Sequence, residues 1–435
     1  MKETNVSVRS AARDSLVAFA KHGKYTNLEV ASTLSKERFP DADRKLYTNL
    51  VYGVAERIPT LDFIANGLSS RKLEAVDIET LTCIRLGLYQ LLYTDRIPDH
   101  AAVAETVAVS PKRSKGFVNA LLREFIRRDK KFDIPYREDS AEYISVKYSC
   151  PVPMCAFLIE KLGTDGARSL LSSAFEKKSV TVRVNSLRST AEEVIKSVFP
   201  DGKISPYTDD VIDVPSLFGA DMSDGRWFVQ DTASRLAVSA LSPKRGETVI
   251  DVCSAPGGKS FSAAIDMENE GKIYSFDLHE NKINLIKSGA ARLGIDIIEA
   301  SCRDASEPDG SLVGTADRVI CDAPCSGLGV IAKKPDIKYK DPSEIEHLPE
   351  VQLRVLKGAS RYVKRGGILV YSTCTVNPDE NEGVVKRFLE NDPAFETEPF
   401  EAGKISAPDG MITLLPAKHN TDGFFICKMK RTAGN

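Results

Sequence analysis

The chain has 435 residues, more than one ordinary hydrophobic core serves, so we expect two or three domains. With 42% hydrophobic and 28% charged residues it resembles a globular protein, and no apolar run reaches the ~18 residues that suggest a membrane span. It lacks the apolar segment of a secretory signal, and nine scattered cysteines do not suggest a disulfide framework, so we expect free thiols in a cytoplasmic protein.

The net charge of −2 is unevenly distributed along the chain. Residues 1–130 carry 21 Lys and Arg against 16 Asp and Glu, a balance of +5, so the remaining residues carry −7. A basic module joined to a mildly acidic one suits a polyanion-binding appendage on an enzyme. Ordinary solvated helix faces would give the same balance, so charge alone leaves both interpretations open.

Residues 1–135 are predicted to form a helical domain, because apolar residues recur there with helical spacing and little strand-like alternation is present. We interpret these apolar stripes as core positions. They are Leu81, Ile84, Leu88, Leu91 and Leu92, then Ala101, Ala104, Val107 and Ala108, and finally Phe117, Leu121 and Phe125.

Residues 136–225 are predicted to form a small connecting α+β subdomain, with strands at 180–185 and 211–214 and a helix at 190–198. Residues 226–432 show a different rhythm, in which short apolar runs alternate with helical stretches. This is typical of an α/β domain with a mostly parallel sheet. Its expected strands are 248–252, 273–277, 297–300, 319–322 and 368–372, followed by a hairpin of 411–415 and 424–429.

A glycine-containing loop, Asp-Val-Cys-Ser-Ala-Pro-Gly-Gly-Lys at 251–259, follows the first of these strands. Adjacent glycines let the backbone approach a ligand closely, so a nucleotide-like cofactor fits there. Asp277 ends the next strand, where a carboxylate can bind ribose hydroxyls, and Asp304 follows the third, near an adenine amino group. The G-x-G-x-x-G pattern of many dehydrogenases is absent. The candidate cofactor residues are Cys253, Ser254, Ala255, Pro256, Gly257, Gly258, Lys259, Asp277, Asp304 and Asp322.

Two further motifs place a cysteine after a parallel strand, where such sheets keep their active sites. Asp-Ala-Pro-Cys-Ser-Gly-Leu-Gly at 322–329 contains Cys325, and Tyr-Ser-Thr-Cys-Thr at 371–375 contains Cys374. A single cysteine in such a place is usually inert packing. Two of them beside a cofactor loop indicate a catalytic site.

Together, the motifs at 251–259, 322–329 and 372–375 resemble those of the cytosine-C5 RNA methyltransferases of the Sun/NOL1/NOP2 family. The segments 229–231 and 422–425 resemble further signatures of that family. The segments 43–46, 52–53, 87–92 and 100–106 resemble the NusB-like RNA-binding domain that is fused to its bacterial 16S ribosomal RNA members. One departure is that Lys333 and Lys334 stand where arginines are expected, which keeps the charge but could alter bidentate phosphate contacts.

The resemblance implies a class I, Rossmann-like methyltransferase domain that uses S-adenosyl-L-methionine. It implies that Cys374 is the nucleophile that adds to cytosine C6, that Cys325 assists product release, and that Asp322 contacts the cytosine edge. Covalent addition makes C5 nucleophilic enough to accept a methyl group. Chemistry alone does not choose between the cysteines, because DNA cytosine methyltransferases use the Pro-Cys position. Lys259 could support the loop or form a salt bridge with Asp322.

The implied substrate is 16S ribosomal RNA. The same reaction on transfer RNA, or a non-catalytic RNA-binding scaffold, remains an alternative, although a scaffold has no need of both Cys325 and Cys374. A dehydrogenase is disfavoured by the glycine pattern. We expect no metal site, no membrane association and no obligate protein partner, and we take a monomer as the default state.

Overall fold

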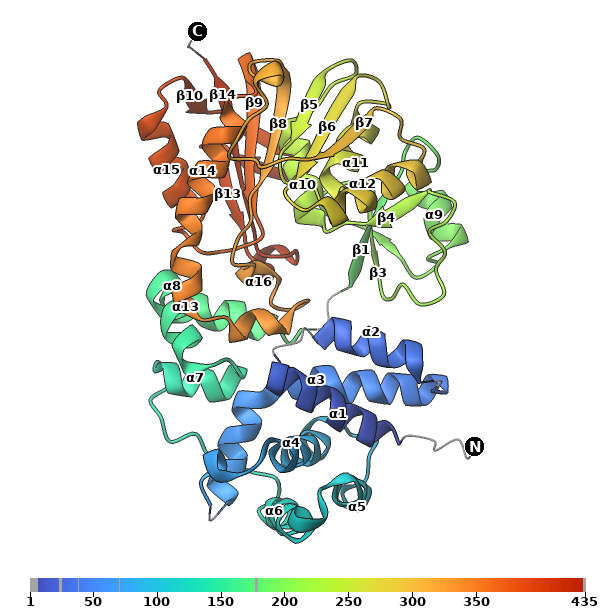
Figure 1. The fold of residues 1–435 in the computed structure, drawn as a ribbon, viewed down its shortest axis with the longest axis vertical. Helices are drawn as coiled ribbons and strands as arrows, with labels where there is room; N and C mark the ends of the chain where they lie inside the picture. Colours follow the sequence, from blue (N-terminus) through green and yellow to red (C-terminus); the bar gives the residue numbers. More distant parts are fainter. Residues whose placement is uncertain (1–6, 23–25, 38, 70, 177–178, 433–435) are drawn as a thin grey trace. The chain divides into compact units, whose positions relative to one another are not determined.

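The computed structural model describes residues 7–22, 26–37, 39–69, 71–176 and 179–432 (Figure 1). Its contacts group the chain into two compact units. Met1–Leu171 and Lys334–Asp341 form the helical unit, and Ser172–Lys333 with Pro342–Asn435 form the sheet unit. We had expected limits near residues 135 and 225. Among the described residues, no helix combines the length and apolar character that crossing a membrane requires.

The helical unit is built around α4 (Ile78–Tyr93), which is covered on all its faces, since residues 82–91 are all buried. The expected stripe of α4 lies in its core, where Ile84, Leu88 and Leu91 are buried. Asp77 caps this helix, because its side chain accepts a hydrogen bond from the Thr80 backbone. The helices are α1 (Val8–His22), α2 (Thr26–Lys36), α3 (Asp41–Leu68), α4 (Ile78–Tyr93), α5 (Asp99–Val109), α6 (Lys115–Arg127), α7 (Ala141–Tyr148) and α8 (Val152–Ser173).

A short segment distant in sequence completes the helical unit. Lys334–Asp341, which contains the 3-10 helix η5 (Pro335–Tyr339), is grouped with residues 1–171. The Lys338 ammonium donates hydrogen bonds to the carbonyl oxygens of Glu56 and Ser149, both at 3.0 Å. Burial lowers the pKa of Lys338 to about 8. The Tyr339 hydroxyl donates to the Ala55 carbonyl at 2.7 Å.

The sheet unit begins with a small antiparallel sheet in the order β2-β3-β1-β4. Arg183 of β1 is buried, and its guanidinium pairs with Asp210 at 2.7 Å and Asp266 at 3.1 Å. Asp266 ends the helix α11 (Gly258–Asp266), which packs on the main sheet, so these ion pairs connect the small sheet to the main one. The elements are β1 (Val180–Val184), α9 (Ala191–Ser197), β2 (Lys203–Ile204), β3 (Val211–Val214) and β4 (Trp227–Val229).

The main sheet has the order β10-β14-β9-β8-β5-β6-β7, with β13 paired to β14. Strands β9, β8, β5, β6 and β7 are parallel, and β14 is antiparallel to β9. Each expected run overlaps one of these strands, with ends that differ by at most five residues, and the expected hairpin is the pair β13–β14. The strands are β5 (Thr248–Asp251), β6 (Lys272–Asp277), β7 (Ile298–Cys302), β8 (Ala316–Asp322), β9 (Val363–Thr373), β10 (Phe395–Thr397), β13 (Met411–Leu414) and β14 (Phe424–Arg431).

Helices cover both faces of the main sheet, as Figure 1 shows. Apolar residues of α10 (Thr232–Leu241), α11 (Gly258–Asp266) and α12 (Glu280–Leu293) share one core. Those of α14 (Leu348–Ser360) and α15 (Glu382–Asn391) share another. The predicted architecture, a helical region followed by an α/β domain, is therefore confirmed. The apolar pattern did not predict β4, β10 or the two-stranded sheet of β11 (Phe400–Ala402) and β12 (Ile405–Ala407).

Candidate active site

A pocket of about 570 Å³ lies where the parallel strands β5, β6 and β8 end. Because the carboxyl ends of parallel strands meet at one edge, their loops place residues from distant motifs together. Seven candidate residues from the sequence line the pocket, whereas Ser254, Pro256, Gly257, Gly258 and Lys259 do not. The lining candidates are Cys253, Ala255, Asp277, Asp304, Asp322, Cys325 and Cys374.

The glycine-containing loop is shaped by residues that lie outside this lining. The Ser254 hydroxyl donates to the Phe276 carbonyl at 2.9 Å, which fixes the loop to the end of β6. Gly257 has a φ of 112°, and a Cβ there would lie 2.3 Å from the Phe261 ring. Only glycine tolerates both this backbone conformation and this close contact.

The two expected acidic residues lie in different surroundings. Asp277 is buried at the end of β6, and its carboxylate accepts the backbone N–H groups of Ala255 at 3.2 Å and His279 at 3.1 Å. Asp304 is exposed, and hydrogen bonds from the side chain and backbone of Ser306 lower its pKa. Asp304 therefore stays ionised at neutral pH at the open side of the pocket.

Sequence reasoning missed several lining residues. His279 and Lys282 follow Asp277 at the start of α12. Because they are close in sequence to Asp277, which was expected to bind the cofactor, they could have been predicted to line the same pocket. Val351, Arg354 and Val355 come from α14. Their i, i+3, i+4 spacing places them on one helix face, but no motif indicated which helix would face the pocket.

Asp251, at the start of the loop, is fully buried. One carboxylate oxygen accepts the Ser260 hydroxyl at 2.7 Å, and the other has no hydrogen-bond partner among the described residues. Burial raises the pKa of Asp251 to about 7.

Lys259, Asp322 and Ser372 form a polar chain beside the thiols. The expected salt bridge is present, since the Lys259 ammonium lies 2.7 Å from one Asp322 oxygen. The other Asp322 oxygen accepts the Ser372 hydroxyl at 2.7 Å. Burial opposes the charge on Lys259, but the ion pair with Asp322 outweighs it and raises the Lys259 pKa. Lys259 therefore remains a cation.

The sulfur atoms of Cys325 and Cys374 lie 3.3 Å apart, although the residues are 49 positions apart in sequence. The hydrogen bond with Cys374, burial, the electrostatic interaction with Cys374 and, to a smaller extent, the negative charge of Glu380 raise the pKa of Cys325 well above its usual range. The Lys259 ammonium interacts electrostatically with Cys374. Lys259 thus interacts with Cys374, and Glu380 and Asp322 interact with Cys325.

A buried carboxylate that sequence reasoning missed holds the two cysteine loops together. One oxygen of Glu380 accepts the Ser326 backbone N–H at 2.8 Å and the Gln352 side-chain amide at 2.9 Å. The other accepts the Asn377 amide at 3.0 Å. Glu380 therefore joins the residue after Cys325 to the loop after Cys374.

A second contact between the loops is made by backbone alone. The Gly329 N–H donates to the Cys374 carbonyl at 3.0 Å, and the Gly423 N–H donates to the Gly329 carbonyl at 2.9 Å. A Cβ at Gly329 would lie 1.8 Å from the Gly423 carbonyl oxygen, so a side chain does not fit there.

Lys333, the departure noted in the sequence, joins two of the family-like segments. Its ammonium lies 2.7 Å from carboxylate oxygens of both Asp231 and Asp422. Burial, together with the charge of Asp231, raises the pKa of Asp422 to about 6. Lysine thus makes both ion pairs here without a guanidinium.

Comparisons with known proteins place this site in a family. The sequence model for the 16S rRNA methyltransferase RsmB/F matches residues 238–430, and that for the NusB family matches residues 6–127. The probable ribosomal RNA small subunit methyltransferase B of Bacillus subtilis (strain 168) is 35% identical over 99% of this chain and 100% of its own. The chain belongs to the ribosomal RNA small subunit methyltransferase B family.

Solved structures share the fold of this methyltransferase family member. The crystal structure of PH0851 has a TM-score of 0.78 at 24% identity and covers 99% of both chains. NSun6 from Pyrococcus horikoshii, solved with SFG, has a TM-score of 0.59 at 22% identity and covers 65% of this chain and 99% of its own. The family and fold expected from the sequence are confirmed.

Proposed function

We propose that the chain transfers a methyl group from S-adenosyl-L-methionine to carbon 5 of a cytosine in 16S ribosomal RNA, through a covalent adduct between Cys374 and C6. The observation that carries this proposal is the pair of thiols 3.3 Å apart, at the edge of a pocket that follows the parallel strands. Membership in a ribosomal RNA methyltransferase family supplies the substrate class.

The pocket suits S-adenosyl-L-methionine in size and chemistry. Its volume of about 570 Å³ is within the usual range for small-molecule sites. The buried Asp277 carboxylate is suited to bind ribose hydroxyls, and Asp304 to bind an adenine amino group. The loop 253–259 would lie against the bound ligand at the end of β5. When bound, S-adenosyl-L-methionine supplies an electrophilic methyl group.

Electrostatics favour Cys374 as the nucleophile. A thiolate, not a thiol, attacks C6, and the nearby Lys259 cation stabilises negative charge on the Cys374 sulfur. The hydrogen bond with Cys374 and burial, with smaller contributions from the charges of Glu380 and Asp322, raise the pKa of Cys325 and keep its proton in place. The Cys325 S–H group can therefore donate a hydrogen bond to the Cys374 thiolate before the attack.

The proposed reaction has two stages. The Cys374 thiolate adds to C6, electron density moves to C5, and C5 takes up the methyl group. A base then removes the C5 proton, the C5–C6 double bond forms again, and the C6–S bond breaks to return the thiolate. We assign Cys325 to this release stage. Asp322, held by Lys259 and Ser372, would contact N3 or N4 of the cytosine.

Mass spectrometry of nucleosides tests the proposal. The full chain is incubated with S-adenosyl-L-methionine and either 16S ribosomal RNA or transfer RNA, and we expect 5-methylcytidine only in the ribosomal arm. Cys374→Ala should abolish the product yet change cofactor affinity less than about threefold, under roughly 1 kcal/mol. Exposed Cys302→Ala is the matched control that should retain activity. Formation of 5-methylcytidine by Cys374→Ala would refute the nucleophile assignment. Formation of 5-methylcytidine in transfer RNA alone would refute the assignment of 16S ribosomal RNA as the substrate.

The roles of the chain's parts follow from the same proposal. The helical unit, most of which matches the NusB family, would bind RNA, and the sheet unit would carry the reaction. Four expectations remain predictions. They are domain boundaries at residues 135 and 225, a monomeric state, a cytoplasmic location and the absence of an obligate protein partner.

A further inference from the structure

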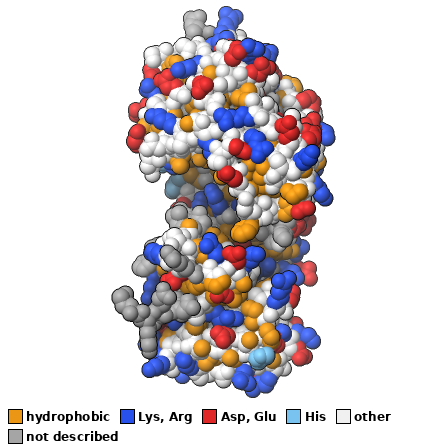
Figure 2. Space-filling model, turned by 90° about the vertical axis from the view of Figure 1, so that its right-hand side faces the viewer, with side chains coloured by type: hydrophobic (Ala, Val, Ile, Leu, Met, Phe, Trp, Pro, Cys, Tyr) orange, Lys and Arg blue, Asp and Glu red, His pale blue; other side chains and the backbone are white. Residues whose placement is uncertain are grey.

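A second, smaller cavity of about 470 Å³ lies in the small antiparallel part of the sheet unit. It is lined by three cations, two hydroxyls and one carboxylate, and none of these residues belongs to the candidate active site. The lining residues are Arg188, Ser189, Glu193, Lys196, Ser197 and Arg226. Charged side chains of both signs are interspersed over the face drawn in Figure 2.

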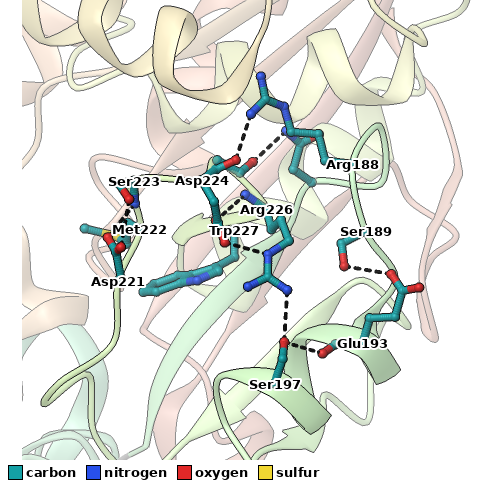
Figure 3. Close-up of polar contacts among 12 residues, drawn as sticks. Arg188, Ser189, Glu193, Ser197, Asp221, Met222, Ser223, Asp224, Arg226 and Trp227 are labelled. Atoms are coloured by element: carbon teal, nitrogen blue, oxygen red, sulfur yellow. Dashed lines mark hydrogen bonds and ion pairs between the residues drawn. The ribbon is translucent and has the colours of Figure 1, made fainter.

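Arg226 is held in a fixed orientation at this cavity. Its Nε atom donates to an Asp224 carboxylate oxygen at 2.6 Å, and one terminal nitrogen donates to the Ser197 hydroxyl at 2.9 Å (Figure 3). The other terminal nitrogen has no hydrogen-bond partner among the described residues. The guanidinium is therefore immobilised with donor capacity to spare.

Arg188, labelled in Figure 3, is also positioned by backbone. One terminal nitrogen donates to the Asp224 carbonyl at 2.7 Å. A Cβ at Gly294 would lie 2.2 Å from the other terminal nitrogen, so the guanidinium rests against bare backbone. Lys196 is exposed and has no partner in the described part of the chain.

The carboxylates beside these cations are already engaged. Glu193 caps its own helix, because it accepts the Thr190 backbone N–H at 3.1 Å and the Ser189 hydroxyl at 2.9 Å. Asp224 accepts the backbone N–H and Nε of Arg226. The cavity thus keeps unused N–H donors on its cations, whereas one Glu193 oxygen and both Asp224 oxygens already accept local hydrogen bonds. Spare cationic donors are the chemistry of an anion site.

We propose that this cavity binds a backbone phosphate of the RNA substrate. Guanidinium, ammonium and hydroxyl donors are the groups that contact RNA phosphates. The inference rests on the proposed function only for its RNA substrate. The cavity borders the carboxyl end of α12, whereas the amino end of this 14-residue helix lines the cofactor pocket.

That placement predicts which kinetic parameter the site controls. A 14-residue helix is roughly 20 Å long, so a phosphate bound here cannot belong to the reacting cytidine. The site should raise RNA affinity without acting on the chemical step. Neutralising it should raise KM for RNA and leave kcat at saturating RNA unchanged.

The test is RNA binding by the double variant Arg188→Gln/Lys196→Gln in the full chain, with 16S ribosomal RNA and increasing salt. We expect weaker binding, and a plot of log affinity against log salt shallower by roughly 1. The matched control, Arg365→Gln/Lys386→Gln, removes two exposed cations elsewhere in the sheet unit and should retain the wild-type slope.

Three outcomes would overturn the proposal: unchanged affinity and slope in the Arg188/Lys196 variant, the same loss in the control, or a lowered kcat with an unchanged KM. Competition with inorganic phosphate forms a separate arm. Phosphate binding that the variant abolishes while RNA affinity is unaffected would identify a small-anion site and also refute the proposal. Because RNA binding is measured without S-adenosyl-L-methionine, the binding result does not depend on whether the methylation mechanism is right; only the comparison of kcat and KM does.

Discussion

The two sulfur atoms in the active site differ in their neighbours, although both residues are cysteines. Cys374 interacts with the Lys259 cation, and Cys325 with the Glu380 carboxylate. A thiol that keeps its proton is a poor nucleophile but a good hydrogen-bond donor. In the proposed mechanism this thiol is Cys325, whose proton is held mainly by its hydrogen bond with Cys374 and by burial.

Cys325→Ala should trap the covalent intermediate. Attack by Cys374 and methyl transfer need no group on Cys325, but release of the adduct would lose its assisting thiol. We expect an RNA–protein adduct that survives denaturing electrophoresis, and its loss in the double variant with Cys374→Ala. If Cys325 only packs in the loop, the single variant will be less stable or less active and will form no adduct. An adduct in the double variant would mean that another residue is the nucleophile.

Asp277→Ala should weaken S-adenosyl-L-methionine binding by roughly 1.5–3 kcal/mol, the scale of losing a charged hydrogen-bond partner. The Asp277 carboxylate is held by the Ala255 and His279 backbone N–H groups, so it is already oriented before a ligand binds. Isothermal calorimetry measures the change, with Asp296→Ala on the same sheet unit as an exposed control. Equal affinities in the wild type and Asp277→Ala would remove this residue from the cofactor site.

Asp251 should make the folded state less stable as pH rises. Its folded pKa of about 7 exceeds the unfolded value of about 3.9. Between these values the folded protein retains a proton that the unfolded chain has released, so the free energy of unfolding falls from pH 4 to pH 7, by at most about 4 kcal/mol. Asp251→Asn should lack this decrease. Urea unfolding at pH 5 and pH 8 measures the free energy of unfolding of the wild type and of Asp251→Asn. If this free energy changes equally with pH in both proteins, Asp251 does not hold a proton in the folded state.

At the scale of elements, strand ends were predictable and the residues that connect them were not. Strand β8 and the motif after it were expected because apolar periodicity and the Asp-Ala-Pro-Cys sequence coincide there. Glu380 lies in the polar sequence Asn-Pro-Asp-Glu-Asn-Glu, which reads as an exposed loop. Its burial depends on donors from Ser326 and Gln352, and no local pattern links positions so far apart.

Glu380→Gln should increase the distance between the two cysteine loops. A glutamine side chain has a single acceptor oxygen, so its amide nitrogen would face either Ser326 and Gln352 or Asn377, all of which donate. We expect adduct formation to slow by roughly 10- to 100-fold, the scale of 1–3 kcal/mol. Exposed Glu382→Gln, two residues away, is the matched control.

A thiol-bridging reagent such as dibromobimane separates positioning from simple loss of stability. It joins Cys325 to Cys374 only when both sulfur atoms are close, and only folded protein is compared. We expect slower bridging in Glu380→Gln and the wild-type rate in Glu382→Gln. A wild-type bridging rate in Glu380→Gln, whatever its stability, would show that this carboxylate does not set the sulfur spacing.

At the scale of the whole chain, the helical unit is discontinuous in sequence. Lys334–Asp341 directly follows Lys333, which is ion-paired in the sheet unit, yet its own contacts lie with residues 1–171. Sequence periodicity predicts neither the ion pairs of Lys333 nor the contacts of the segment Lys334–Asp341. The segment is short and polar, and the partners of Lys338 are the backbone carbonyls of Glu56 and Ser149, which carry no sequence signal. A domain boundary drawn from sequence alone therefore misses this segment.

Lys338→Met should destabilise the helical unit by roughly 1–3 kcal/mol, because the carbonyls of Glu56 and Ser149 would lose their donor inside the protein. Lys334→Met, an exposed position in the same segment, is the matched control and should change the free energy of unfolding little.

The wild type should also gain stability between pH 8 and about pH 10.4, because the folded pKa of Lys338, about 8, lies below the unfolded value and the unfolded chain binds more protons in that range. Lys338→Met should lack this gain. Denaturant unfolding of the full chain, followed by a probe in the helical unit at both pH values, measures the two effects together. Equal stability of the two methionine variants would show that the buried ammonium does not hold the segment in place.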